Sequence, residues 1–199
     1  MSDVAKRLPP GQYEARTWPV LHFGEIPSTD EQAWRFRIYG AVAQERTLSL
    51  AEFRALPTAD VSADFHCVTK FSVFDNDWHV VRCRDVLALV DLQPGASDVM
   101  VEAMEGYTAN LPLGVFDDDD TLFAWQRNGE DLTPEHGWPL RLVVPKRYAW
   151  KSAKWLTGLE FTDVNRRGFW EVRGYHVHAE PFAEERYSYQ EGPRAELEP

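Results

Sequence analysis

Apolar and polar residues alternate along several short stretches of the chain, and this two-residue period is typical of half-buried β-strands. The clearest alternation covers residues 34–42, and another covers residues 61–65 and leads to His66 and Cys67. Short, mainly apolar runs predict further strands at residues 78–81, 99–104, 140–144, 158–164 and 170–173. The hydrophobic pattern therefore predicts many short strands spread over most of the chain.

The sequence predicts fewer helices than strands, and the predicted helices are short. Ser49 and Glu52 have the spacing of a capping box, which predicts a short helix at residues 50–56. Asp85 stands near the start of a second predicted helix at residues 85–92. We find neither an internal repeat nor the regular alternation of strands and helices that marks a doubly wound sheet. The predicted fold class is therefore α+β, mixed and strand-rich.

The length of 199 residues suits one domain with a sizeable core. We predict an N-terminal arm at residues 1–17, one domain at residues 18–187 and an acidic C-terminal tail at residues 188–199, with loose attachment from residue 183 onward. Residues 1–10 contain neither the apolar stretch of a signal peptide nor a twin-arginine pair. No apolar run approaches the roughly 20 residues of a membrane-spanning helix. We therefore expect a cytoplasmic protein without membrane insertion.

Charge limits the classes of ligand. The formal net charge of −11 argues against a nucleic-acid partner. Between His136 and Tyr175, however, eight lysines and arginines stand against three acidic residues. This basic stretch could hold a small anionic ligand, or it could be a solvated face. The four aspartates at residues 117–120 could form a cation site, although a solvated turn is the more ordinary interpretation.

Several well-known sites are excluded by their missing motifs. The sequence contains no glycine-rich nucleotide loop, no serine-hydrolase elbow and no zinc-protease helix motif. Its two cysteines, Cys67 and Cys83, are too few for a disulfide framework or a cysteine-rich metal site. The pair His176 and His178 is too small a set for a metal site. We interpret Cys83, which lies between two arginines, as structural.

Residues 64–72 read D-F-H-C-V-T-K-F-S, so a predicted strand delivers Cys67 to its end and a polar loop follows. A buried structural cysteine is the common alternative. His66 and Lys70 could nevertheless stabilise a thiolate, which is the form of cysteine that binds metals. Lys70 is also a candidate for steering an anionic substrate, or it is an ordinary surface lysine.

Residues 136–156 read H-G-W-P-L-R-L-V-V-P-K-R-Y-A-W-K-S-A-K-W-L. Arg141 interrupts an otherwise apolar strand, where a charge is costly unless it is paired or binds an anion. Ser152 and Lys154, with the backbone N–H groups between them, could complete a phosphate-binding cradle.

These two segments together resemble the molybdopterin-binding domain of the sulfite oxidase family, in particular its small bacterial sulfite oxidase-like members. The resemblance covers about residues 18–187 and includes G-F-W-E at residues 168–171 and E-E-R-Y at residues 184–187. It implies the sulfite oxidase-type fold and a cofactor of molybdenum and molybdopterin.

The resemblance also implies roles for individual residues. Cys67 would be the thiolate ligand of molybdenum. The residues that would hold the pterin and its phosphate are His136, Arg141, Ser152, Ala153 and Lys154, with His22 and Thr108 as further candidates.

The activity that follows from this resemblance is two-electron oxygen-atom transfer, with a small oxo-anion, sulfite or a sulfoxide-type compound as substrate. The chain has no room for a haem domain, so a separate electron-transfer protein or soluble carrier would exchange electrons with it. Two alternatives remain open: a non-catalytic molybdopterin-binding carrier or partner module, and a structural domain without a cofactor.

Overall fold

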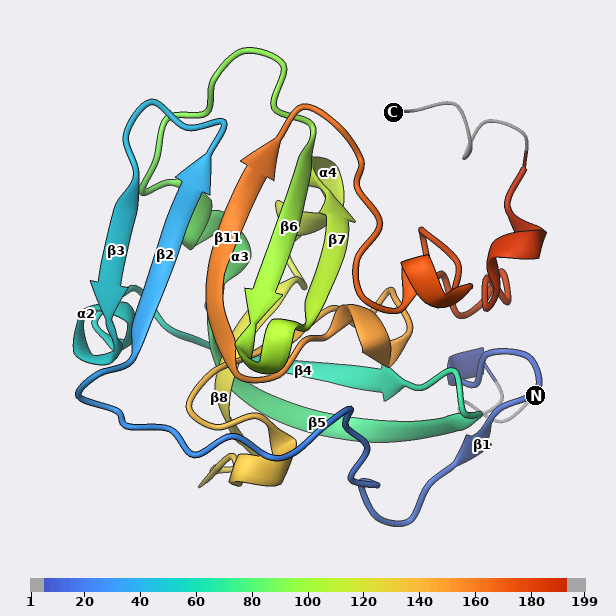
Figure 1. Ribbon diagram of the computed structural model, residues 1–199. Coiled ribbons are helices and arrows are strands. Elements are labelled where there is room, and N and C mark those ends of the chain that lie inside the picture. Colours follow the sequence, from blue (N-terminus) through green and yellow to red (C-terminus); the bar gives the residue numbers. More distant parts are fainter. Residues whose placement is uncertain (1–5, 193–199) are drawn as a thin grey trace.

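A computed structural model describes residues 6–192, and two β-sheets form its framework (Figure 1). The first sheet has the order β1–β5–β8–β10, with β4 also paired to β5 and β9 to β8. Its strands are β1 (Tyr13–Glu14), β4 (Ala59–His66), β5 (Phe71–Arg82), β8 (Leu122–Arg127), β9 (Glu130–Asp131) and β10 (Arg141–Val143).

The second sheet has the order β3–β2–β11–β6–β7. Its strands are β2 (Arg35–Gly40), β3 (Arg46–Ser49), β6 (Asp98–Ala103), β7 (Thr108–Pro112) and β11 (Leu156–Thr162). In Figure 1 this sheet stands upright, and β4 and β5 run crosswise beneath it. The pairing of β11 with β2 is parallel, whereas its pairing with β6 is antiparallel, so the sheet is mixed as predicted.

The helices are short. The α-helices are α2 (Leu50–Arg54), α3 (Cys83–Leu87) and α4 (Leu113–Phe116), and 3-10 helices occupy Met104–Gly106, Pro134–His136, Ala149–Lys151, Glu171–Arg173 and Ser188–Gln190. Helix α2 begins with the predicted capping box, in which Ser49 and Glu52 bond each other's backbone N–H groups. Within residues 6–192, no helix has the length and apolar character needed to cross a bilayer.

Alternation in the sequence places one face of strand β2 in the core, whereas strands such as β10, whose sequence is mainly apolar, are buried on both faces. In β2, for example, Phe36 and Ile38 are buried while their neighbours Arg35 and Arg37 are exposed. Phe36 packs edge-to-face against aromatic rings of α2 and β8, with ring centroids 5.1 and 5.6 Å apart. The apolar pattern thus joins the two sheets through one principal core.

The predicted strands at residues 34–42, 61–65, 99–104, 140–144 and 158–164 are confirmed, and residues 78–81 belong to the longer strand β5. The prediction of a strand at residues 170–173 is wrong. A 3-10 helix forms there because Gly174 turns left-handed after it and the Glu171 side chain turns inward to a buried partner. The predicted helix at residues 85–92 instead spans Cys83–Leu87.

The loose attachment predicted from residue 183 is wrong for the described residues 183–192. Arg186 donates to the carbonyl oxygens of Val68 and Pro10, and Glu191 pairs with Arg167. Residues 193–199 lie outside the described part of the chain, as do residues 1–5 of the predicted arm. The rest of that arm adds strand β1 beside β5.

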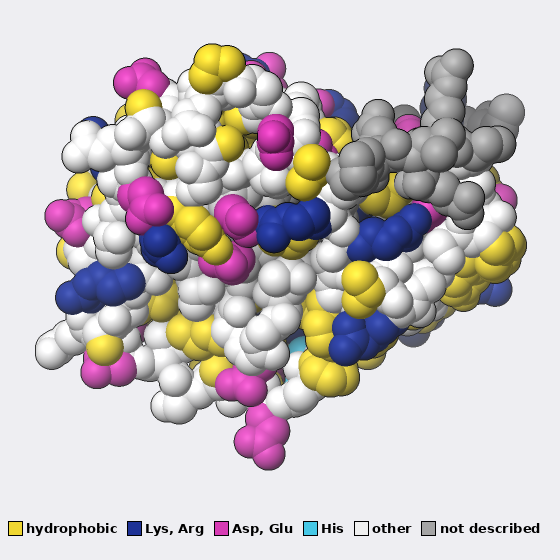
Figure 2. Space-filling model, turned by 45° about the horizontal axis from the view of Figure 1, so that its top comes forward, with side chains coloured by type: hydrophobic (Ala, Val, Ile, Leu, Met, Phe, Trp, Pro, Cys, Tyr) yellow, Lys and Arg dark blue, Asp and Glu magenta, His cyan; other side chains and the backbone are white. Residues whose placement is uncertain are grey.

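The lysines and arginines between His136 and Tyr175 do not form one solvated face, because some are buried and others form ion pairs. Arg141 and Lys151 are buried. The exposed Lys146 and Arg166 pair with Asp118 and Glu160, and the half-buried Arg167 pairs with Glu191. Figure 2 shows lysine and arginine side chains as separate groups beside acidic ones on the face it draws. The aspartate run forms a turn that pairs with Lys146 and Arg84, as expected of a solvated turn.

Candidate active site

A cavity of about 310 Å³ lies between the end of β4, the segment after β1 and the loop that follows β10. It is large enough to hold a small organic ligand. Many of the residues predicted to bind the cofactor line it, although they come from distant parts of the chain. These are His22, Cys67, His136, Arg141, Ser152, Ala153 and Lys154.

Cys67 reaches the cavity because strand β4 ends at His66 and a tight turn follows. The Cys67 backbone bonds Phe71 and Lys70, which closes this turn. The hydroxyl of Thr69 donates to the Cys67 sulfur over 3.2 Å. Burial raises the pKa of the Cys67 thiol, and the Thr69 hydrogen bond opposes this shift. A metal ion at this position would displace the thiol proton.

Among the described residues, neither His66 nor Lys70 contacts the Cys67 sulfur, so the geometry does not support the prediction that they stabilise its thiolate. Neighbouring residues of a strand point to opposite faces, and the His66 ring lies 2.8 Å from the Ser72 hydroxyl, away from the cavity. Burial lowers the pKa of His66 to about 4, so it carries no charge at neutral pH. Lys70 is exposed, has a left-handed φ of 79° and is not among the lining residues.

Arg141 is an unusual residue for the cavity wall, because it carries a charged guanidinium and yet lies in strand β10 with only 1% of its surface exposed. Its hydrogen bonds go to the carbonyl oxygens of His136, Ser152 and Leu142, and among residues 6–192 it forms no ion pair with a carboxylate. Burial and the nearby Arg127 lower the pKa of Arg141 to about 9. A buried cation that lacks a counter-charge favours an anionic ligand.

Lys154 adds a second cation beside Arg141. Its ammonium group donates to the carbonyl oxygens of Leu21 and Glu135 over 2.7 and 2.5 Å. Burial and the charge of Arg141 lower the pKa of Lys154 to about 7. Ser152 is buried as well, and its hydroxyl oxygen accepts from the Val144 N–H, which shapes the loop.

His136 presents an unsatisfied polar atom to this region. Its ring stacks on Trp18 with centroids 4.1 Å apart, and its Nδ1 lies 3.2 Å from the Thr133 hydroxyl. Nε2 is buried and bonds no other atom of residues 6–192. Buried polar atoms are normally hydrogen-bonded, so a ring nitrogen left unpaired on a cavity wall is suited to bonding a ligand. Burial lowers the pKa of His136 to about 4, so the ring is neutral.

Gly137 allows these groups to come together. It has a left-handed φ of 111°, and a Cβ there would lie 3.0 Å from the Arg141 Cβ and 3.2 Å from the Lys154 Cβ. Only glycine combines this backbone conformation with so close an approach. The cavity wall thus suits a ligand that has a phosphate group and a soft metal. Arg141 and Lys154 could bind the phosphate, the Cys67 thiol could bind the metal, and the His136 ring could bond a further polar group.

His22 lines the cavity from the N-terminal segment, where its ring packs edge-on against Trp155. Thr108 is not among the lining residues. It starts β7, and its carbonyl oxygen accepts from the Phe169 N–H. Its predicted role therefore has no support in the geometry.

Much of the cavity wall was missed by the sequence interpretation, because it consists of aromatic residues that are typical of an ordinary core. Trp18, Tyr107, Trp150, Trp170 and Tyr175 all line it. Three of them could have been predicted, since Trp150, Trp170 and Tyr175 lie in or beside the segments that carry the family resemblance.

A buried ion pair stands behind this aromatic wall. The Lys151 ammonium lies 2.5 Å from Glu171 and also donates to Asn110, and both charged side chains have no exposed surface. The Trp150 indole donates to the same Glu171 carboxylate over 3.0 Å. The pair therefore positions one wall of the cavity.

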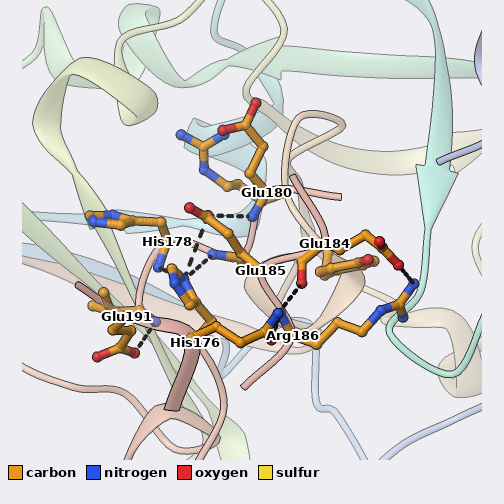
Figure 3. Close-up of polar contacts among 12 residues, drawn as sticks. His176, His178, Glu180, Glu184, Glu185, Arg186 and Glu191 are labelled. Carbon is orange, nitrogen blue, oxygen red and sulfur yellow. Dashed lines mark hydrogen bonds and ion pairs between the residues drawn. The ribbon is translucent and has the colours of Figure 1, made fainter. Parts of the chain in front are cut away.

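The segment around Arg186 stabilises the loop that carries Cys67 through a hydrogen bond. Arg186 donates to the Val68 carbonyl oxygen over 2.8 Å, and its guanidinium lies over the Tyr148 ring. Figure 3 shows how neighbouring side chains order this segment: Glu185 accepts from the Glu180 N–H and lies beside His176. Within residues 6–192, no group of three or more His, Cys, Asp or Glu side chains is arranged to hold a metal ion, and the rings of His176 and His178 lie with centroids 5.7 Å apart.

The lowered pKa of Lys154 predicts pH-dependent anion binding by protein prepared without cofactor. The charged ammonium attracts an anion and is lost as the pH rises through about 7, whereas Arg141 stays charged until about 9. Affinity for sulfate, which remains divalent over this range, should therefore fall by up to about tenfold per pH unit above 7. Isothermal titration between pH 6 and 8.5 measures this. The Lys154→Met variant should bind more weakly at pH 6 and lose this pH dependence.

Comparison with known proteins agrees with this geometry. The sequence model of the oxidoreductase molybdopterin binding domain matches residues 23–170. The chain is 42% identical over 189 residues to the uncharacterized oxidoreductase YuiH of Bacillus subtilis, covering 94% of this chain and 96% of YuiH. It is 27% identical over 188 residues to the sulfite oxidase of Arabidopsis thaliana, covering 76% of this chain and 48% of that protein.

Among solved structures, the sulfane dehydrogenase SoxCD from Paracoccus pantotrophus superposes with a TM-score of 0.66 at 20% identity, covering 75% of this chain and 42% of that chain. This likeness confirms the predicted sulfite oxidase-type fold. The family match and the YuiH relationship confirm the family predicted from the sequence: the chain belongs to the oxidoreductase molybdopterin binding domain family, whose members use molybdopterin and molybdenum for redox chemistry.

Proposed function

We propose that Cys67 ligates molybdenum and that Arg141, Lys154 and the loop at residues 152–154 hold the phosphate of the pterin. One observation carries this proposal: a single cavity joins a thiol to two cations, of which Arg141 is fully buried and forms no ion pair with a carboxylate of residues 6–192. The unpaired Nε2 of His136 would bond a polar group of the pterin.

When bound, the molybdenum cofactor supplies two-electron oxygen-atom transfer. The residues of this chain bind and orient it. Thr69 holds the sulfur of Cys67 in a fixed direction, Arg141 offers a fork of donors suited to phosphate, and the aromatic residues exclude water. We propose that the substrate is a small oxo-anion, sulfite or a sulfoxide-type compound, and that a separate electron-transfer protein or soluble carrier exchanges the electrons.

Metal and pterin analysis tests the proposal. Protein from a host that makes the cofactor should contain about one molybdenum and one pterin per chain, because the cavity has one thiol and one cationic cluster. Oxygen-atom transfer to or from sulfite, a sulfoxide or an N-oxide, with a dye as electron carrier, should be detectable. Absence of both molybdenum and tungsten would overturn the proposal. A loaded protein without turnover would instead favour the non-catalytic carrier.

Replacing Gly137 with alanine should reduce pterin content. The new Cβ would press on Arg141 and Lys154 and adopt a strained φ, at a cost of about 1–3 kcal/mol. Gly95→Ala is a matched control, because Gly95 has a φ of 93° but no heavy atom within 4 Å of the added Cβ. Pterin content per folded protein should fall in Gly137→Ala and stay normal in the control. Equal losses in both variants would show that backbone strain alone is responsible.

A further inference from the structure

A segment without helix or strand, residues 19–29, covers part of the cavity, and we call it the strap. In Figure 1 it belongs to the extended blue trace that joins β1 to β2. Leu21 and Phe23 line the cavity and are each 49% exposed, so they lie between the cavity and solvent. Within residues 6–192, no backbone group of the strap bonds another backbone group. Side-chain contacts therefore hold the strap in place, which is typical of the least stable parts of a fold.

The two ends of the strap, in contrast, are firmly anchored. Before it, the Trp18 ring stacks on His136 with centroids 4.1 Å apart and packs edge-on against Phe65 at 5.6 Å. After it, the carbonyl oxygen of Asp30 accepts from the N–H of Trp34, whose side chain is buried. The strap can therefore move between two fixed points without disturbing either sheet.

Only a few contacts join the middle of the strap to the rest of the described chain. The Lys154 ammonium donates to the Leu21 carbonyl oxygen over 2.7 Å. The Phe23 ring lies 4.6 Å from the Phe169 ring and 6.3 Å from that of Trp170, which itself lines the cavity. The aromatic contact thus joins the strap to the segment after β11 at the edge of the cavity. So few contacts can break transiently while the sheets stay folded.

We infer that the strap is a lid that opens to admit the pterin cofactor and closes over it, with the Phe23 contact holding it shut. This inference rests on the proposed function and adds the route by which the ligand enters. The Lys154 ammonium has three N–H donors, and two of them bond the carbonyl oxygens of Leu21 and Glu135. The third can bond phosphate. A phosphate that fixes the ammonium also fixes Leu21, so ligand binding and closure support each other.

The rates of cofactor uptake and release distinguish a lid from a rigid wall. In Phe23→Ala both rates should rise about fivefold, because loss of an aromatic contact worth about 1 kcal/mol favours the open strap in empty and loaded protein alike. Their ratio, which is the affinity, should stay unchanged. Pterin fluorescence measures both rates, with molybdopterin released from another molybdenum enzyme as the ligand.

Phe182→Ala is the matched control for these rates. Phe182 is 51% exposed, close to the 49% of Phe23, but it does not line the cavity. Both rates in this variant should equal those of the unmodified protein. Faster release from Phe23→Ala with unchanged uptake would show that Phe23 is only a cofactor contact, and it would overturn the lid.

Labelling of Cys67 measures opening of the strap in protein prepared without cofactor. The sulfur lines the cavity, so a bulky maleimide must enter the cavity to reach it. Cys83 is fully buried in the main core and reports unfolding of the whole domain. The ratio of the two labelling rates, measured by mass spectrometry at one pH, should rise about fivefold in Phe23→Ala and stay constant in Phe182→Ala. An unchanged ratio in Phe23→Ala would refute the lid.

These two tests separate the lid from the proposed function. Unmodified protein that takes up no pterin would refute the proposed function, and the labelling ratio would still decide whether the strap limits access to the cavity. Pterin uptake and release at unchanged rates in Phe23→Ala would refute the lid and leave the proposed function intact.

Discussion

Replacement of Cys67 by serine should abolish turnover and leave the pterin bound. The cationic residues that would hold the phosphate lie on β10 and the loop after it, whereas Cys67 lies at the end of β4. Loss of the thiol would therefore remove the proposed metal ligand without disturbing the proposed phosphate contacts. Mutation of a residue that only supports a metal ligand reduces activity by up to about 100-fold. Removal of the ligand itself should therefore reduce activity by more than about 100-fold.

Three measurements on one preparation check this expectation: pterin content, molybdenum content and kcat. Pterin should stay near the level of the unmodified protein, while kcat falls below detection. Cys83→Ala is the matched control, since Cys83 is fully buried in the main core and lies outside the cavity. It should lower stability but keep kcat in the folded fraction. Substantial activity in Cys67→Ser would disprove ligation by this sulfur.

Many strands of the fold follow from the sequence pattern, because half-buried strands alternate apolar and polar residues and fully buried strands such as β10 are mainly apolar runs. Phe36 and Ile38 in β2 show this directly. The main elements of the site also could be predicted. A cysteine at a strand end and an arginine within an apolar strand are each costly or unusual, and the structure brings both to one cavity.

Other features depend on contacts between distant segments, which a local pattern does not encode. The G-F-W-E segment has the composition of a strand, but Glu171 pairs with Lys151 and the backbone coils instead. The direction of the turn after Cys67, with a left-handed Lys70, decides that this lysine points outside the cavity. Arg186 holds the Cys67 loop from 118 residues away along the sequence.

Replacement of Lys151 by methionine should lower the free energy of unfolding by about 3–5 kcal/mol, which is the usual cost of leaving one member of a buried ion pair alone. Both charged side chains have no exposed surface. Within the described part of the chain, one oxygen of the Glu171 carboxylate has no hydrogen-bond partner, so loss of Lys151 would leave the other oxygen with the Trp150 indole alone. Urea denaturation followed by circular dichroism measures the change.

A second substitution distinguishes an uncompensated charge from a simple loss of packing. In the double variant Lys151→Met with Glu171→Gln, the amide oxygen can still accept from Trp150, but no charge is buried. Its stability should therefore recover most of the loss seen in Lys151→Met. Arg166→Met is the control, because it removes an exposed pair with Glu160 and should cost less than about 1 kcal/mol. A double variant as unstable as Lys151→Met would show that the lysine stem, rather than its charge, supports the aromatic wall.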